Sequence, residues 1–469
     1  ILLNTLLRKN YILIMYIEMS LAQSKRKLRQ IRPTNIGKNE WSFKEGTPQI
    51  EFSMKGVEVV QGRTLRLNGI FECFDANNKK PSNNTPLASK IALHPSNVNI
   101  DSRIGLHSVL ENVSINNATT GRNYEIVKHY NRMVSSLQPK SSSQSAYIGG
   151  GLDMNGMTSK GGQTGNLVNR QLNFSLPIHI GMLKENLDLN LLGGLNIVLD
   201  LAPDSFVLHD NNYVNSADTT ATGSYYKLKD LVLTYDAIMP TGKALSSMAM
   251  ARSGQFNYKS FSSYYTTVVS ADSNHIFNLN TAMAKSVIMN FVPSRWINNS
   301  QRNSSMNVPL LNDVGGVLKR KAKLTDITFL RNNVKYPLDF TLPAKDMMTQ
   351  TDNPNPYILY EDINALRVPS KNVSVLVSPV NTRGFGNVRP NEAEYFPSSN
   401  FRGSHDPVFN LSVGYDHIKN MGVSFKNAPF GFRIRSKLTN GVDNPHSLYL
   451  FVEQLNTLSI NNGVISVMN

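Results

Sequence analysis

The sequence predicts an all-β protein built from two consecutive β-sandwiches, with short helices and long loops. The length of 469 residues favours two or three domains over one. Only 17% of the residues are charged, while Asn, Ser, Thr and Gly are abundant, a composition typical of strands and polar loops rather than long helices. In many segments apolar residues alternate with polar ones, or run together for a few positions between Gly and Asn.

Composition also excludes several protein classes. Hydrophobic residues make up 40% of this long chain, so it can bury a large core, which excludes intrinsic disorder and a disulfide-dependent mini-fold. The single cysteine, Cys73, cannot form an intrachain disulfide or a Cys-rich zinc site. The formal net charge of +15 indicates a polyanion among the partners, either nucleic acid or an anionic membrane surface.

Residues 1–44 are predicted to form an N-terminal arm. Residues 11–17 (YILIMYI) are apolar but far shorter than the roughly 20 residues of a membrane span, and no small-x-small cleavage site follows them. We expect translation to start at Met19, with Met15 as the alternative, and residues 1–18 to be upstream sequence read in frame. No other window reaches transmembrane length, which predicts a soluble or assembled protein.

The arm carries the candidate binding residues of the chain. Such a basic cluster can neutralise phosphates of nucleic acid or of lipid head groups. A solvated, disordered terminus fits the same residues, so both interpretations stay open. A second basic cluster in the C-terminal half allows the same two interpretations. The arm cluster is Lys25, Arg26, Lys27, Arg29 and Arg32, and the second is Lys319, Arg320, Lys321 and Lys323.

The first sandwich is predicted over residues 45–240. An amphipathic helix is expected at 123–137, because its Tyr, Val and Leu residues recur three or four positions apart. Residues 138–168, which end in a Gly-rich stretch, have no apolar periodicity and are expected to form a long loop. Strands are expected at 49–54, 64–74, 109–115, 172–180, 195–201 and 225–238.

A linker at 241–255 and a second sandwich at 256–469 are predicted from the change of composition at 239–254. Residues 346–401, polar and rich in Pro and Asn, are expected to form another long loop. Because no blade period of about 40–50 residues appears, two sandwiches of jelly-roll type fit better than one barrel or a propeller. Strands are expected at 264–269, 275–279, 286–291, 324–330, 336–340, 409–415, 431–437, 448–454 and 464–468.

Four stretches, spanning most of residues 45–467, carry a resemblance to a known family. Residues 102–137 (SRIGLHSVLENVSINNATTGRNYEIVKHYNRMVSSL) contain a strand, a Gly-led turn and a Tyr-containing helix. Residues 170–183 (RQLNFSLPIHIGML) precede the strand of GGLNIVLDLAPD. Residues 323–340 (KLTDITFLRNNVKYPLDF) and 447–467 (SLYLFVEQLNTLSINNGVISV) follow in the second half. Together they resemble the double jelly-roll major capsid proteins of the polinton-like virus, virophage and adenovirus-like lineage.

The resemblance implies a viral building block. In that family three subunits form a pseudo-hexameric homotrimeric capsomer that tiles an icosahedral shell, so the implied partners are further copies of the chain, penton proteins and minor or cement capsid proteins. The implied location is the virion, assembled inside the host cell. The loops at 138–168 and 346–401 would form exposed towers or clasps between subunits. The basic arm would lie on the inner face, towards an internal membrane, a cement protein or the genome.

We expect no catalytic, cofactor or metal site, and therefore a protein that is not an enzyme. The nine His residues are scattered without an HExxH or His-x-His pair, and no GxSxG motif occurs. Gly156 and Gly161 have phosphate-loop spacing, but Gly162 and Gln163 replace the Lys and Ser/Thr that such a loop needs. The segment 383–386 (RGFG) is too short for a dinucleotide fingerprint.

Two other functions rank below the capsid building block. A β-sandwich receptor- or carbohydrate-binding spike or fibre protein would use a shallow aromatic groove, yet Trp41 and Trp296 are the only Trp residues. A β-sandwich hydrolase would need convergent polar groups in a pocket, and the sequence shows no such constellation.

Overall fold

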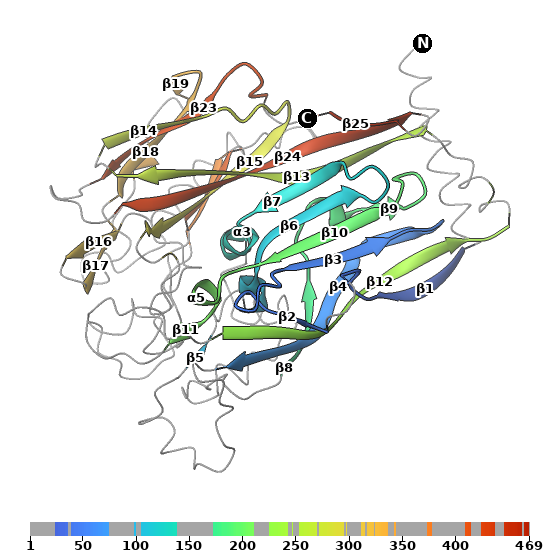
Figure 1. Cartoon of the computed structure of the whole chain (residues 1–469). Coiled ribbons are helices and arrows are strands. Elements are labelled where there is room, and N and C mark those ends of the chain that lie inside the picture. Colours follow the sequence, from blue (N-terminus) through green and yellow to red (C-terminus); the bar gives the residue numbers. More distant parts are fainter. Residues whose placement is uncertain are drawn as a thin grey trace, which may run out of the picture.

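The alternating segments form two β-sandwiches, drawn one above the other in Figure 1. The fold class expected from the sequence, all-β with two consecutive jelly-roll sandwiches, is confirmed. This computed structural model describes residues 24–35, 39–74, 98–99, 105–137, 172–210, 225–242, 246, 253–269, 272–294, 297, 311–314, 317–322, 324–335, 342–343, 373–377, 409–413, 424–436, 445–461 and 464–468.

The first sandwich consists of two facing sheets. Sheet 1 contains β1 (Ser24–Ile31), β2 (Glu40–Trp41), β4 (Val59–Phe74), β8 (Leu172–Pro177), β9 (Asn186–Asp188) and β12 (Tyr225–Pro240). Sheet 2 contains β3 (Gln49–Met54), β6 (Leu110–Asn117), β7 (Asn123–Lys128) and β10 (Leu195–Leu201). The strand order is β1-β12-β4-β8 in sheet 1, where β2 also pairs with β12 and β9 with β4, and β3-β10-β6-β7 in sheet 2.

The chain crosses repeatedly between these two sheets. It passes from β3 in sheet 2 to β4 in sheet 1, returns for β6 and β7, and crosses again for β8 and β9. β10 then inserts between β3 and β6, and β12 inserts between β1 and β4. All of these pairs are antiparallel. Non-sequential strands therefore become neighbours, as in a jelly roll.

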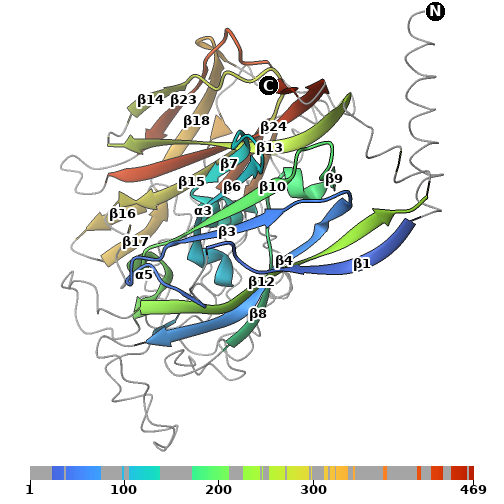
Figure 2. The ribbon, with the colours of Figure 1, turned by 45° about the vertical axis from the view of Figure 1, so that its right-hand side comes forward.

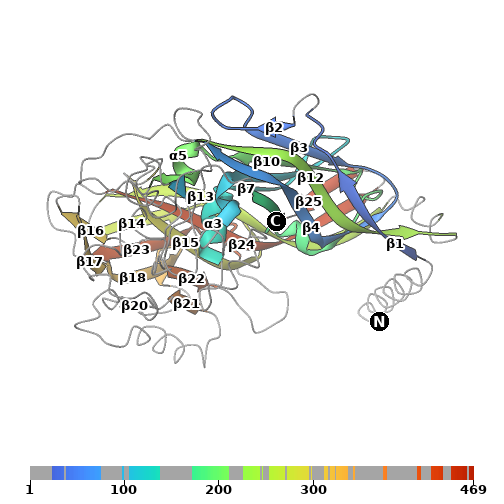
Figure 3. The same ribbon diagram turned by 90° about the horizontal axis from the view of Figure 1, so that it is seen from below.

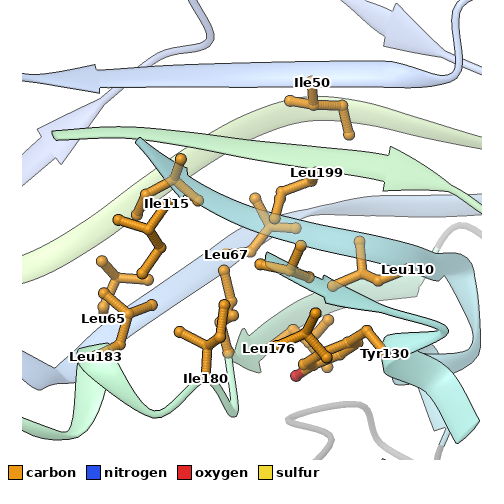
Figure 4. Close-up of a cluster of buried hydrophobic side chains, with 14 of the residues drawn as sticks. Ile50, Leu65, Leu67, Leu110, Ile115, Tyr130, Leu176, Ile180, Leu183 and Leu199 are labelled. Carbon is orange, nitrogen blue, oxygen red and sulfur yellow. The ribbon is translucent and has the colours of Figure 1, made fainter. Parts of the chain in front are cut away.

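Strict alternation along β10 shows how the sequence builds the core. Leu195, Ile197, Leu199 and Leu201 are buried, and the residues between them are half-exposed. Successive side chains of a strand point to opposite faces, so one face of β10 enters the core. Figure 4 shows Leu199 there with inward side chains from both sheets, including Ile50 and Leu67. Burying each such side chain contributes about 1.5–3 kcal/mol.

The second sandwich also has two sheets. Sheet 3 contains β13 (Ser253–Val268), β15 (Ala284–Pro293), β24 (His446–Asn461) and β25 (Val464–Met468), with β24 pairing with the other three strands. Sheet 4 contains β14 (Asp272–Phe277), β18 (Leu324–Arg331), β19 (Val334–Lys335), β20 (Leu342–Pro343) and β23 (Phe430–Ser436), with β23 between β14 and β18.

The strand β24 joins the two sandwiches, because residues 446–452 are buried on both faces. Tyr449 and Phe451 belong to the core cluster that fills the first sandwich. Leu448 and Leu450, which alternate with them, are also buried and point to the opposite face. Figures 1 and 2 show sheet 3 between sheet 4 and the first sandwich. The apolar run LYLFV is therefore that of a strand covered on both sides.

Short helices and small ribbons complete the described part of the chain. None of its helices is long and apolar enough to cross a membrane. The helices are η1 (Gly105–Val109), α3 (Tyr130–Leu137), η3 (Met182–Lys184) and α5 (Asp204–Val207). The ribbons pair β5 (Val98–Asn99) with β11 (His209–Asp210), β16 (Leu311–Val314) with β17 (Val317–Ala322), and β21 (Val373–Val377) with β22 (Phe409–Val413).

The prediction of a helix at 123–137 is correct only for its second half. Residues 123–128 form β7, which pairs with β6, and α3 begins only at Tyr130. His129 separates the two with a positive φ of 56°. The apolar spacing fits a helix, but pairing with β6 buries Tyr124 and Val127 in the sheet. The strand expected at 336–340 and the loop at 138–168 lie outside the described residues, as does the loop at 346–401 apart from β21.

Candidate functional site

The basic cluster of the predicted arm lies on an edge strand of the first sandwich. Lys25, Arg26 and Lys27 are exposed on β1, at the end of the strand order in sheet 1. Figure 3 shows β1 beside β12, at the end of the molecule away from sheet 4. The residues of β12 that pair with Lys25, Arg26 and Lys27 carry no charge. Such charges keep the unpaired backbone of an edge strand from joining another sheet, so this cluster has a structural use beside its attraction for polyanions.

Arg29 differs from its basic neighbours because it is committed to an internal ion pair. Its Nη2 lies 2.7 Å and its Nε 2.9 Å from Oε2 of Glu58, which is buried. The other oxygen of Glu58 accepts a hydrogen bond of 2.8 Å from the Tyr235 hydroxyl. Burial and the Glu58 carboxylate both raise the pKa of Tyr235, so the hydroxyl remains a donor. Arg29 therefore fastens β1 to the sandwich, whereas Arg32, just after β1, is exposed.

The second basic cluster is only partly described. Lys319, Arg320 and Lys321 belong to β17, which forms a hairpin with β16. Lys323 lies outside the described residues. The two clusters are on separate sheets, with β1 in the first sandwich and β17 in a separate ribbon.

A buried carboxylate, Glu125, lies where the two sandwiches meet. It belongs to β7 and is only 4% exposed. Its Oε1 accepts hydrogen bonds from the N–H groups of Gly181 at 3.2 Å and Phe261 at 2.9 Å, and its Oε2 accepts one from Met182 at 2.8 Å. Phe261 is on β13, so one carboxyl group links sheet 2, the η3 segment and sheet 3.

Two further hydrogen bonds join the same strands. The hydroxyl of Tyr258 donates to the carbonyl of Tyr124 at 2.9 Å, and the hydroxyl of Ser263 donates to the carbonyl of Lys128 at 2.9 Å. Both donors lie on β13 and both acceptors on β7. Side chains, rather than a backbone ladder, therefore fasten β7 to β13 at this junction.

Arg132 forms a second fastening between the sandwiches. It is 2% exposed, and its guanidinium lies 4.9 Å from the ring centre of Phe206 and 4.3 Å from that of Tyr449. Phe206 is on α5 of the first sandwich, and Tyr449 is on β24 of the second. A planar cation stacked on aromatic faces gains about 0.5–2 kcal/mol from each contact.

The carboxylate of Glu111 and the imidazole of His129 lie in the same region as Arg132 and Tyr449. His129 Nδ1 lies 2.6 Å from Glu111 Oε1, and the rings of His129 and Tyr449 form a T-shaped pair with their centres 4.7 Å apart. Burial raises the pKa of Glu111, but the hydrogen bond and charge of His129, together with the charge of Arg132, outweigh it and lower that pKa. Glu111 therefore stays ionised at neutral pH and complements the cation.

His179 lies just after β8 and is half-buried. Its backbone N–H donates to the Tyr130 hydroxyl at 2.8 Å, and that oxygen lies 3.2 Å from His107 Nδ1. Burial, followed by the charges of Lys184 and Arg66, lowers the pKa of His179 to about 4, so its ring is neutral. Within the described residues no group of three or more His, Cys, Asp or Glu could hold a metal ion.

The remaining sequence motifs have little structural counterpart. The segments at 156–163 and 383–386 lie outside the described residues, as does Trp296. Cys73 is buried. Trp41 is 3% exposed and belongs to the core cluster, so it is not part of an open aromatic groove. Glu125 and Arg132 were missed because the sequence assigned both to one helix, and no spacing motif marks either.

Comparison with known proteins identifies the fold. No family model and no curated protein matches the chain. Among solved structures it is similar to the PBCV-1 virus capsid, with 12% identity, a TM-score of 0.56, and coverage of 95% of this chain and 97% of that chain. It is also similar to the Faustovirus major capsid protein, with 10% identity, a TM-score of 0.55, and coverage of 93% and 91%.

These neighbours are double jelly-roll major capsid proteins, and the alignments include both sandwiches. The chain therefore has the double jelly-roll fold that its sequence resembles. Since the identity is so low, this likeness establishes the fold and not the function.

Proposed function

We propose that the chain is a structural, non-enzymatic major capsid protein, three copies of which form a pseudo-hexameric capsomer that tiles an icosahedral shell. The observation that carries this proposal is the double jelly-roll fold shared with capsid proteins over 95% of the chain. A trimer of this chain would arrange six similar sandwiches around one axis, giving a nearly hexagonal outline. A trimer whose subunits had only one sandwich each would not have this outline.

Location and partners follow from this role. The protein belongs to the virion, assembles inside the host cell, and contacts its own copies, penton proteins and minor or cement proteins. Its units are an arm at 1–44, a first jelly roll at 45–240, a linker at 241–255 and a second jelly roll at 256–469. The end of β12 at Pro240 and the start of β13 at Ser253 support this division. The arm contributes β1 and β2 to sheet 1, so part of it is integral to the first sandwich.

Light scattering after size-exclusion chromatography tests the trimer. At micromolar concentration we expect a species of three times the 52.2 kDa monomer mass, or larger closed assemblies. A specific glycan-array signal from a protein that remains monomeric at all concentrations would instead favour the spike or fibre function.

The basic cluster is proposed as a polyanion contact on the inner face of the shell. Lys25, Arg26, Lys27 and Arg32 are the contact residues, because they are exposed. Arg29 is excluded from this set, since its guanidinium is paired with Glu58. The polyanion is either an internal membrane or the genome, and the two are separable with anionic vesicles and single-stranded DNA.

Neutralising the exposed cations should separate binding from stability. The triple variant K25A/R26A/K27A is expected to weaken binding to the preferred polyanion about tenfold or more at low salt, and to reduce its salt dependence. The free energy of unfolding of this variant should change by less than about 0.5 kcal/mol per substitution. Arg29→Gln should have the opposite effects. It should lower the free energy of unfolding by about 1–3 kcal/mol, because it breaks the ion pair with the buried Glu58, and it should change polyanion binding little. Equal binding of the triple variant and the wild type would exclude this surface as the contact.

A further inference from the structure

We propose that the contact between the two sandwiches of one chain is repeated between chains, so that β19 of one copy lies against β1 of the next. This contact, called the seam below, rests on the trimeric capsomer proposed above. The partner that covers β1 is therefore a second copy of this chain.

The second sandwich repeats the strand order of the first. Sheet 1 has the order β1-β12-β4 and sheet 3 the order β13-β24-β15, with all of these pairs antiparallel. The strands β12 and β24 both have 16 residues. Sheet 2 has the order β3-β10-β6-β7 and sheet 4 the order β14-β23-β18-β19. By position, β1 therefore corresponds to β13, and β19 corresponds to β7.

Within one chain, β7 and β13 meet at the junction of the sandwiches. The N–H group of Phe261 on β13 donates to Glu125 on β7 at 2.9 Å. The hydroxyl groups of Tyr258 and Ser263 on β13 donate to backbone carbonyl groups of β7. Both strands lie at the edge of their sheets, and so do their counterparts β19 and β1.

The strands β19 and β1 are too far apart to meet within one chain. Figures 1 and 3 show β1 and sheet 4 at opposite ends of the molecule. In a ring of six sandwiches built from three chains, half of the contacts lie inside chains and half between chains. Nearly six-fold symmetry requires the two kinds to be alike, and a head-to-tail contact that closes after three copies meets this requirement. The contact between chains therefore joins β19 to β1.

Exposed apolar side chains lie on both strands of the seam. Leu28 of β1 is 60% exposed, and it points to the opposite face of the strand from Arg29, which is paired with the buried Glu58. Val334 of β19 is 68% exposed. Burial of apolar surface is the main favourable term in most protein association. The cations that precede Leu28 border the seam, where their long side chains can still reach solvent.

Cysteine crosslinking of the full chain tests the seam. In the double variant Leu28→Cys/Val334→Cys, a short bismaleimide should link the chains into a covalent trimer of three times 52.2 kDa. The single variants Leu28→Cys and Val334→Cys should run as monomers on a denaturing gel, because the same residue of two copies does not meet itself in a head-to-tail ring. Since Cys73 is buried, the wild type gives the background.

The matched control is the double variant Leu28→Cys/Ile276→Cys. Ile276 is 58% exposed and belongs to β14, at the edge of sheet 4 opposite to β19. This control should give no covalent trimer. A covalent trimer from the control, or linked chains in either single variant, would overturn the seam. An unlinked Leu28→Cys/Val334→Cys trimer would overturn it too.

Light scattering of the same preparations separates the seam from the capsomer. A wild type that never forms trimers contradicts both, whereas a trimeric wild type with the wrong crosslinks contradicts the seam alone. Leu28→Asp should raise the concentration at which trimers dissociate about tenfold or more, and Ile276→Asp should leave it unchanged. Equal dissociation of these two variants would count against the seam even if no crosslink formed.

Discussion

Replacing Arg132 by alanine is expected to lower the free energy of unfolding by about 3–5 kcal/mol. The substitution removes a buried cation that lies over the rings of Phe206 and Tyr449, and it leaves the half-buried carboxylate of Glu111 with less compensation for its charge. It also opens a cavity between α3, α5 and β24, where the two sandwiches meet. Denaturant titration, followed by the fluorescence of the buried Trp41, measures the loss.

Two variants make the Arg132 result specific. Arg132→Lys keeps the charge but cannot stack a planar group on two rings, so an intermediate loss is expected. Arg26→Ala removes an exposed arginine from β1 and should change the stability by less than about 0.5 kcal/mol. Equal stability of Arg132→Ala and Arg26→Ala would show that the stacked guanidinium does not join the sandwiches.

Gly181→Ala is expected to destabilise the protein by about 3 kcal/mol or more, a large effect for the addition of one methyl group. The φ of −63° at Gly181 suits any residue, so backbone strain does not explain the glycine. The added Cβ would overlap with the backbone carbonyl of Lys259, and neither segment has a flexible side chain there that could move aside. The η3 segment and β13 would have to separate, which breaks the hydrogen bonds to Glu125. Thermal unfolding measures the effect.

Gly254→Ala is the matched control for this close approach. Its added Cβ would lie 2.9 Å from Cδ2 of Leu191, the far end of a side chain that can rotate. A loss below about 1 kcal/mol is expected, since only a rotamer change is needed. If both alanine variants were equally stable, the backbone contact between η3 and β13 would not be tight.

The alternation of apolar and polar residues was enough to predict strands that have one buried face and one face in contact with solvent. The strand β10 coincides with its predicted range of 195–201, because Leu and Ile alternate with polar residues along it. The strand β24 is longer than the predicted 448–454, since it extends to Asn461 by pairing with β13 along its whole length. That pairing is a contact between distant segments, and periodicity within one segment does not contain it.

The misassigned helix shows the limit of such patterns. Spacings of three and four positions fit the apolar residues of 123–137, but the register Val113↔Val127 with β6 decides the structure. The junction residues depend on the same kind of information. Glu125 contacts Phe261, which is 136 residues away, and Arg29 contacts Glu58 across 29 residues. A buried Glu and an exposed Glu look alike in a sequence until the fold supplies their donors.

Negative-stain electron microscopy of the purified full chain tests the central claim most directly. The claim is that each subunit contributes two jelly-roll sandwiches to a trimeric capsomer, and that these capsomers tile a shell. We predict particles with three-fold symmetry and a nearly hexagonal outline, alone or assembled into closed shells. Isolated two-lobed monomers at every concentration and ionic strength would contradict it.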